Sequence, residues 1–338
     1  MNAIKQALLN AFTETKKVVV ERWMIFAIVF GFYAVVSILI ATGTLNRYYT
    51  FLLISVMIMI VLAASLNIAT GFLGQLVLGH AGFMAIGAYT AGLIAIQIKD
   101  HIGSDYLIFF ISSIGAMITA GIAGLLVGTP ALRLRGDYLG IMTLGFGEIV
   151  RLIIRNVEFT GGTFGLKGIP RLMTFPMALL TTVIVVTIIY MFINSRHGRA
   201  IISIREDEIA SENVGINITR FKLLGFIVAS MFAGVGGSMF AFKEAILYPQ
   251  SFDFIRSVEI FVVVVLGGMG SLSGTMISAF ILIFVPELLR DFDQYRYLTY
   301  SSLLIIIMLY RPQGLMGKRE IFSFKKRRKL IDSSMNLD

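Results

Sequence analysis

The stretch that constrains this chain most is residues 67–92, which read NIATGFLGQLVLGHAGFMAIGAYTAG. It is apolar enough to lie in a membrane, yet it contains three polar side chains, Asn67, Gln75 and His80, and six glycines, Gly71, Gly74, Gly79, Gly82, Gly87 and Gly92. Glycine weakens helices, and unpaired backbone polar groups cannot face lipid. We therefore predict that this stretch is buried in protein or lines a water-filled cavity.

The glycine-rich stretch has two candidate roles. Small residues recur on one face of a helix, which permits close packing against a second helix; they are Ala81, Ala85, Ala88 and Gly92. The alternative is a wall of a transport path, because polar residues within a membrane are functional candidates by default. The candidates for path lining or helix packing are Asn67, Gly71, Gly74, Gln75, Gly79, His80, Gly82, Gly87 and Tyr89.

The composition is that of a membrane protein with several spans, since 57% of the 338 residues are hydrophobic and only 14% are charged. The net charge of +9 is explained by basic residues beside the spans and does not indicate a nucleic-acid partner. The chain has no cysteine, which excludes disulfides, thiolate catalysis and cysteine-bound metal. The first long apolar run begins at Met24 without a cleavage site after it, which predicts a retained span and not a removed signal peptide.

Apolar runs of membrane length recur along the chain. About 20 apolar residues, at about 1.5 Å rise each, cross the hydrocarbon core of a bilayer. We predict spans at about residues 24–42, 50–68, 107–128, 175–194 and 221–242, a span that begins with the glycine-rich stretch and ends near 98, and a shorter span after a break at Pro130. Residues 259–286 form a longer segment interrupted by GGMGSLSG at 267–274, and 298–310 is the last apolar run.

Basic residues predict the orientation of the spans. They cluster in 1–23, 195–220 and 311–329, which places these three segments in the cytoplasm. The loop TGGTFGLKGIP at 160–170 is rich in turn-forming residues and is expected outside. An unbroken 259–286 span would leave the basic tail on the wrong side, so this segment must be either two short spans or a re-entrant pair.

The fold predicted from these patterns is all-α and polytopic, with about ten membrane segments, some of them glycine-broken or re-entrant, and both termini cytoplasmic. Its parts are a cytoplasmic amphipathic segment (1–23), a single transmembrane domain (24–310) and a basic cytoplasmic tail (311–338). One glycine-broken segment in each half of the chain points to a central pathway. The second break adds Gly267, Gly268 and Gly270 to the candidates for path lining or packing.

Glu148 is the only acidic residue well inside an apolar segment. A charge there must be protonated, paired or in contact with water. Pairing with Arg151, one turn along the same helix, is the favoured interpretation. The alternative is that Glu148 lines the transport path.

The longest polar segment between spans is 195–220, SRHGRAIISIREDEIASENVGINITR. Ser203 followed by Glu206 predicts a capping box, and Gly215 predicts a helix stop, so we expect a short helix on the cytoplasmic face. The apolar residues within it favour a docking surface over a solvated basic loop. Candidate residues for this role are Arg199, Ser203, Arg205, Glu206, Asp207, Glu208 and Gly215.

Motifs for chemistry are missing from the sequence. There is no phosphate-cradling G-x-x-x-x-G-K-[ST], no zinc-binding H-E-x-x-H and no G-x-S-x-G nucleophile motif. The three histidines, His80, His101 and His197, lie in separate segments, so no metal site is predicted. We expect a transport subunit without an ATPase site of its own, not an enzyme, and without a cofactor.

Several motifs together resemble one family of transport proteins. GFLGQ at 71–75, GHAGF at 79–83 and GAY at 87–89 are similar to the permease subunits of branched-chain amino-acid ABC importers. The LivM-type subunit is resembled more specifically by LRLRGDY at 132–138, TLGFGEI at 143–149, TGG at 160–162, GIP at 168–170, GRA at 198–200, REDE at 205–208 and VLGGMGSLSG at 265–274. The resemblance covers about residues 60–315.

The resemblance implies a multi-pass protein of the bacterial inner membrane that pairs with a second, homologous permease subunit. Two cytoplasmic ATP-binding subunits would dock on the 195–220 loop, and an extracytoplasmic solute-binding protein would deliver leucine, isoleucine or valine. An importer for urea or short amides is the alternative within the class, because related permeases share these motifs. An autonomous secondary transporter is a further alternative, and the shortage of buried acidic residues counts against it. A membrane enzyme ranks below both.

Overall fold

The computed structural model describes residues 46–132 and 138–289, together with isolated positions at 31, 36, 37, 39, 42, 301, 302, 305, 309–311 and 313–317. One compact unit comprises Phe51–Glu320, and a second comprises Met1–Thr50 with Ile321–Asp338. Apart from those isolated positions, the predicted spans 24–42 and 298–310 and both basic terminal segments lie outside the described residues.

The described part of the chain consists of helices and loops without a β-strand, which confirms the all-α prediction. Its only extended pairing is a single bridge between Leu166 and Leu247. Five helices within it are long and apolar enough to cross a membrane: Arg47–Phe72 (α2 with the π-helical turn η1), His80–Ile98 (α3), Asp105–Ala131 (α4), Phe175–Asn194 (α6) and Ile218–Glu244 (α9). The chain is thus a polytopic helical membrane protein.

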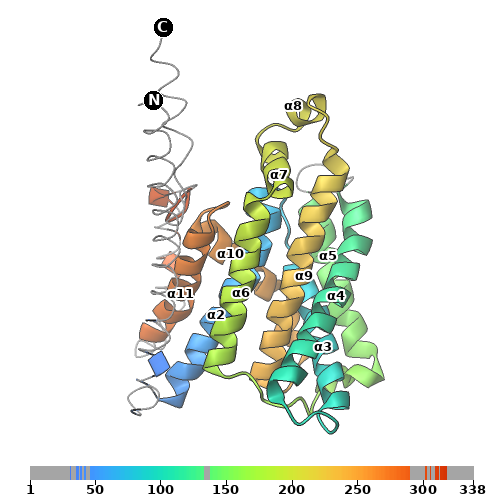
Figure 1. Ribbon diagram of the computed structural model, residues 1–338, viewed down its shortest axis with the longest axis vertical. Coiled ribbons are helices and arrows are strands. Elements are labelled where there is room, and N and C mark those ends of the chain that lie inside the picture. The colour runs from blue at the N-terminus through green and yellow to red at the C-terminus, as the bar shows by residue number, and fades with distance from the viewer. Residues whose placement is uncertain are drawn as a thin grey trace, which may run out of the picture. The chain divides into compact units, whose positions relative to one another are not determined.

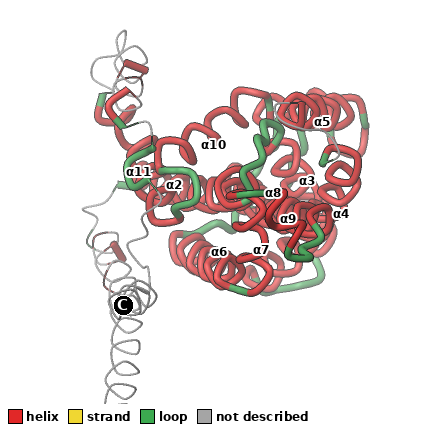
Figure 2. The backbone as a smooth tube through the Cα atoms, turned by 90° about the horizontal axis from the view of Figure 1, so that it is seen from above, coloured by secondary structure: helices red, strands yellow, loops and turns green. Residues whose placement is uncertain are grey.

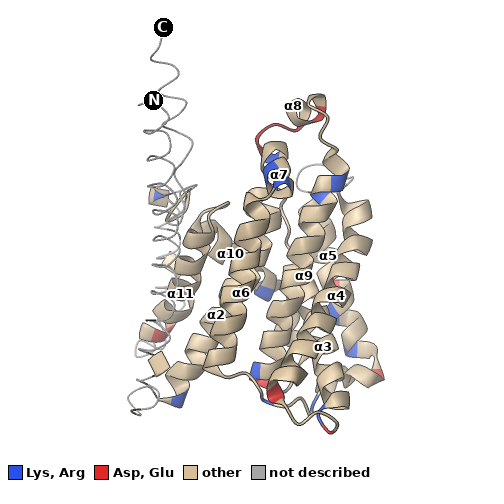
Figure 3. Ribbon diagram, in the orientation of Figure 1, with Lys and Arg blue, Asp and Glu red and all other residues tan. Residues whose placement is uncertain are grey.

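The predicted shorter span after Pro130 corresponds to α5 (Tyr138–Asn156), which has 19 residues but is not one of those five helices. The reason is charge, because α5 carries Glu148, Arg151 and Arg155. In the other long helices the charged side chains lie near the helix ends (Figure 3). Pro130 is accommodated one residue before the end of α4 and does not break the helix earlier.

Helices α3, α4 and α9 pack against one another and lie side by side (Figures 1 and 2). Their backbones touch at glycines. A Cβ atom on Gly87 of α3 would lie 2.4 Å from Cα of Gly234 in α9, and one on Gly237 would lie 2.1 Å from the Met84 carbonyl oxygen. The predicted small-residue face of α3 is buried, with Ala81, Ala85, Ala88 and Gly92 all inside. These contacts confirm the close helix packing that the glycine-rich stretch predicted.

The first helix break lies where the sequence predicted the start of a span. We expected the glycine-rich stretch to begin a span at once, but α2 (Arg47–Asn67) continues into the π-helical turn η1 (Ile68–Phe72). A non-helical segment, 73–79, then leads to α3, which starts only at His80. The predicted start of a span at residue 67 is wrong. Gly74 has φ +76°, and the amide of Gln75 donates to the Ala69 carbonyl (3.0 Å); neither is compatible with a continuous α-helix.

The second helix break is present as predicted. Helix α10 (Phe254–Gly267) and helix α11 (Leu272–Leu288) are separated by the turn 268–271, in which Gly268 and Gly270 have φ of +110° and +90°. The turn is shorter than the predicted 267–274 because Ser271 caps α11, accepting from the amide of Gly274 at 3.1 Å. The hydroxyl of Ser278 donates to the Val263 carbonyl (2.6 Å), which holds the two helices together as a hairpin.

The 195–220 segment forms two short helices and not one. Helix α7 (Arg196–Glu206) is capped by Ser195, and α8 (Glu208–Asn213) is capped by Asp207, whose Oδ1 accepts from the Ala210 amide at 2.9 Å. The predicted capping box is therefore wrong. Ser203 lies inside α7 and its hydroxyl donates to the Ala200 carbonyl at 2.8 Å.

The predicted helix stop is confirmed, since Gly215 follows α8 with φ +88°. The α7–α8 segment and the 160–170 loop are separated by the 20 residues of α6, about 30 Å of helix, so they lie at opposite ends of the helical unit (Figure 1).

Candidate functional site

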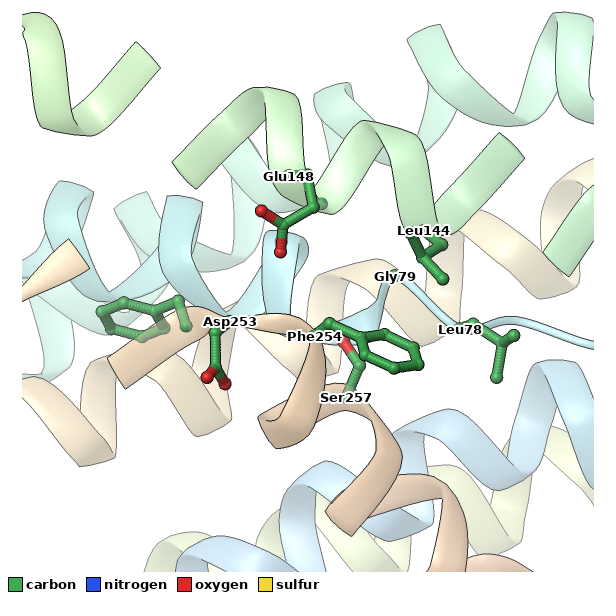
Figure 4. Close-up of a pocket in the computed structure, with 10 residues that line it drawn as sticks. Leu78, Gly79, Leu144, Glu148, Asp253, Phe254 and Ser257 are labelled. Atoms are coloured by element: carbon green, nitrogen blue, oxygen red, sulfur yellow. The ribbon is translucent and has the colours of Figure 1, made fainter. Parts of the chain in front are cut away.

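A small, partly open pocket, with a cavity volume of about 10 Å³ (space for the centre of a water molecule), lies where the start of α3 meets the middle of α5 and the start of α10 (Figure 4). It combines apolar side chains, two acidic residues and a hydroxyl. Its lining residues are Leu78, Gly79, Gly82, Leu144, Gly147, Glu148, Phe252, Asp253, Phe254 and Ser257. Of the residues predicted from sequence, the structure brings Gly79, Gly82 and Glu148 together here.

Glycine is required where α3 meets α5. A Cβ atom on Gly79 would lie 1.7 Å from the Thr143 carbonyl oxygen, and one on Gly82 would lie 2.8 Å from Cα of Gly147. Real Cβ atoms do not approach other atoms so closely, so any side chain would push the two helices apart. Two hydroxyls anchor the same region: Thr143 accepts from the Leu78 amide (3.1 Å), and Ser257 accepts from the Ala81 amide (3.0 Å). The latter bond satisfies one of the free amides at the start of α3.

Glu148 pairs with Arg151, as the sequence predicted. Nε and Nη2 of Arg151 lie 2.8 and 2.6 Å from Oε2 of Glu148. The side chains remain 30% and 25% exposed, although Glu148 lies near the middle of α5. Glu148 also lines the pocket, so the ion pair does not remove it from that pocket.

Asp253 is the acidic pocket residue that the sequence analysis missed. It precedes the apolar run of α10, and its Oδ1 caps that helix by accepting from the Arg256 amide at 3.0 Å. The preference of aspartate for the first position before a helix is the signal that could have identified it. The hydroxyls of Thr143 and Ser257 were missed as well, because their partners, the amides of Leu78 and Ala81, are distant in sequence.

A second group of predicted residues meets at the two helix breaks. The buried side chain of Asn67 accepts from the Gly270 amide (2.9 Å) and donates to the Ser271 carbonyl (3.1 Å) and to Oγ1 of Thr275 (2.8 Å). Gly71 lies against the same turn, since its Cβ atom would lie 2.4 Å from the amide nitrogen of Gly270. The two breaks, about 200 residues apart in sequence, are thus in contact.

His80 and Tyr89 are held by neutral partners in the interior. Nε2 of His80 is 2.8 Å from Oγ of Ser65, and the hydroxyl of Tyr89 donates to the Leu247 carbonyl at 3.0 Å. Both side chains are at least 97% buried. Neither of them lines the pocket between α3, α5 and α10. Within residues 46–132 and 138–289 there is no cluster of three or more His, Cys, Asp or Glu side chains that could hold a metal.

The remaining candidates from the glycine-rich stretch and from the second break lie in different environments. Gly87 touches α9, and Gly267 packs against Gly274, where a Cβ atom would lie 2.6 Å from the backbone. A Cβ atom on Gly268 would lie 2.6 Å from the Gly317 carbonyl oxygen. Gly74 and Gln75 lie in the non-helical segment 73–79. Gly74 is exposed and Gln75 is half-buried.

The α7–α8 segment presents an apolar surface. Ile209 is 75% exposed and Val214 is 82% exposed. Glu208 pairs with Lys222 of α9 (2.9 Å), and Nη1 of Arg199 donates to the Asn194 carbonyl (2.8 Å). Arg205 points the other way, and its guanidinium donates to the Gly71 carbonyl oxygen.

The chain matches a family model described as branched-chain amino acid transport system / permease component over residues 48–311. It is 37% identical, over 295 residues, to the Salmonella typhimurium high-affinity branched-chain amino acid transport system permease protein LivM, covering 77% of this chain and 68% of that protein. The Escherichia coli LivM protein is 38% identical with the same coverage. The Escherichia coli permease LivH is 26% identical over 282 residues, covering 82% and 83%. No solved structure matches the chain.

Proposed function

The chain belongs to the family of branched-chain amino acid transport system permease components, and on this premise we propose how it works within an importer. It is a transmembrane permease subunit of an ABC importer for branched-chain amino acids. The observation that carries this function is the identity of 37–38% over 295 residues to two permeases of that transport system. Neither the urea alternative nor the autonomous transporter has a comparable observation in its favour.

The subunit would work in the bacterial inner membrane with a second permease, two ATP-binding subunits and a solute-binding protein. The exposed apolar residues Ile209 and Val214 suit the docking of ATP-binding subunits. At the opposite end, the aromatic rings of Phe159 and Phe164 are 71% and 80% exposed, which suits contact with the solute-binding protein. ATP hydrolysis on the partners would drive transport, and this chain would carry out no chemical step itself.

The direct test is reconstitution of the four kinds of subunit in lipid vesicles with labelled leucine. We expect leucine uptake that requires ATP and the solute-binding protein and that stops with a non-hydrolysable ATP analogue. Uptake by this chain alone, without any ATP-binding subunit, would instead show an autonomous transporter. Uptake of urea or a short amide but not leucine would show that the substrate class is wrong.

The second permease is proposed to cover the face of α5 that carries Glu148. A half-exposed ion pair near the middle of a spanning helix is costly against lipid, so this face is expected to meet protein or water. Gly145, in the same part of α5, has no neighbouring atom within 4 Å of the point where a Cβ atom would lie, which leaves room for a partner. The pocket beside Glu148 then opens toward the space between the two permeases and belongs to the transport path.

Replacement of Glu148 by glutamine tests this path role. We expect assembly to persist and stability to change by less than about 1 kcal/mol, because a partly exposed pair contributes little. Leucine uptake should fall about tenfold, since Arg151 would be left as an uncompensated charge beside the path. The matched control is Glu259→Gln, which removes an equivalent pair with Arg256 (2.9 Å) outside the pocket and should leave uptake unchanged. Full uptake by the Glu148→Gln importer would contradict the path role.

The proposed topology has about ten membrane segments with both termini in the cytoplasm. In this arrangement α7 and α8 lie inside and the 160–170 loop lies outside, in agreement with their separation by α6. Single cysteines at Ile209 and Phe164, introduced into the cysteine-free chain, test it with a membrane-impermeant thiol reagent. In intact spheroplasts we expect labelling at position 164 and none at 209, and the reverse in inside-out vesicles. Labelling of position 209 from outside would overturn the orientation.

A further inference from the structure

Arg205 connects the α7 helix to the first helix break. Arg205 lies near the end of α7, just before α8 with its exposed apolar residues, yet its side chain is partly buried and Nη1 donates to the Gly71 carbonyl oxygen. Gly71 belongs to the π-helical turn η1, where the regular α-helical ladder is interrupted. A hydrogen bond from a charged donor is stronger than a neutral one, so this contact fixes η1 to α7.

The same side chain also touches the second helix break. A Cβ atom on Gly270 would lie 2.7 Å from Nη1 of Arg205, and one on Gly74 would lie 3.0 Å from Cγ of Arg205. Both glycines have positive φ, +90° and +76°. Arg205 therefore lies in a slot formed by the backbones of both breaks, and a side chain at either glycine would close the slot.

Asn67 completes the connection on the other side of this slot. Its amide group holds Gly270, Ser271 and Thr275 of the hairpin through three hydrogen bonds of 2.8–3.1 Å, and it is fully buried. Contacts thus run without interruption from α7 through Arg205 and Gly71 to Asn67 and the turn 268–271. We call Asn67, Gly71, Arg205 and Gly270 the junction.

The two breaks are the points of the helical unit where the regular α-helical hydrogen bonding is interrupted. Helices α3, α4 and α9 instead have their backbones in contact, which resists a shift of one against another. A rotation at η1 or at 268–271 has to alter only a few backbone hydrogen bonds, such as those from Leu73 to Ile68 and from Ser271 to Gly268 (3.0 Å each). Because Arg205 contacts both breaks, a displacement of α7 would act directly on η1 and on the turn 268–271.

We propose that Arg205 is the residue that couples movement of the α7–α8 segment to both helix breaks at once. This rests on the proposed importer function, in which the ATP-binding subunits move that segment. Arg205 does not meet those subunits; it acts through the junction. Its loss should leave docking intact and separate ATP hydrolysis from transport.

Hydrogen exchange of the purified chain tests the junction independently of any partner. In the Arg205→Gln variant the amides of residues 68–75 and 268–274 should exchange at least about tenfold faster, while the amides of α4 stay unchanged and show that the protein is folded. The control is Lys99→Gln, which also removes a charged donor bonded to a backbone carbonyl, that of Gly168 (3.4 Å), but at the far end of α3 from the first break. Unchanged exchange at either break in Arg205→Gln would overturn the proposal.

Coupling is then measured in the reconstituted importer. With Arg205→Gln we expect normal co-purification of the ATP-binding subunits, continued ATP hydrolysis, and leucine transported per ATP reduced at least about tenfold. Arg205→Lys, which retains one charged donor, should recover part of the coupling, and Lys99→Gln should behave as the wild type. Wild-type coupling in Arg205→Gln, or loss of the ATP-binding subunits from it, would overturn the role given to Arg205. If the wild-type chain shows no ATP-dependent uptake, the importer function is wrong, and the exchange experiment still decides whether Arg205 holds the breaks.

Discussion

Replacing Gly87 by alanine is expected to destabilise the protein, although alanine is the better helix former. In an open helix the change would be favourable by up to about 1 kcal/mol. Here the new methyl group would lie 2.4 Å from both Cα and the carbonyl oxygen of Gly234, which are backbone atoms and cannot rotate away. Overpacking of this kind costs about 1–3 kcal/mol, which exceeds the gain in helix propensity, so the variant should be less stable than the wild type.

Leucine at the same glycine should have a larger effect, because a full side chain cannot fit between α3 and α9. We expect Gly87→Leu to abolish uptake, and Gly82→Leu, against Gly147 of α5 (2.8 Å), to do the same while much of the protein still inserts. The measurements are thermal unfolding in detergent and leucine uptake in vesicles.

The chain offers a matched control for these variants. Gly145 lies in the interior of α5 and has no neighbouring atom within 4 Å of the point where a Cβ atom would lie. Gly145→Ala should therefore be neutral or stabilising in unfolding measurements on the isolated chain. If Gly87→Ala and Gly145→Ala changed stability equally, backbone contact between α3 and α9 would not be what holds them together.

Aspartate at both Ile209 and Val214 is expected to detach the ATP-binding subunits. These side chains are the most exposed apolar groups of the α7–α8 segment, and a docked partner would bury them. Loss of their burial, at about 1.5 kcal/mol or more for each side chain, would weaken docking by about 100-fold. Co-purification with the tagged chain measures this loss directly.

This pair of substitutions is a cleaner test than charge reversal at Glu206, Asp207 and Glu208. Asp207 caps α8 and Glu208 pairs with Lys222, so reversing their charges would unfold α8 as well as alter its surface. Phe164→Asp, which changes an equally exposed apolar residue at the opposite end, is the control and should leave the ATP-binding subunits attached. Full retention of these subunits by the Ile209→Asp, Val214→Asp chain would remove the docking role of α8.

Features that depend on local chemistry were predictable without the structure. Hydropathy predicted residues 175–194 as a span, and α6 has those bounds. Glycine content predicted both helix breaks, and the spacing of Glu148 and Arg151 predicted their pairing. Each of these depends on residues within a turn or two of one another, so the sequence contains all the information needed.

Contacts between distant groups could be identified only from the folded chain. Asn67 finds Gly270 and Thr275 more than 200 residues away, and nothing near Asn67 in the sequence identifies these partners. The helix caps also depend on tertiary packing. Ile201 and Ile204 are buried and keep α7 continuous through Ser203. The caps are therefore Ser195 for α7 and Asp207 for α8. A local pattern offers several ways to satisfy backbone groups, and burial of the apolar side chains selects among them.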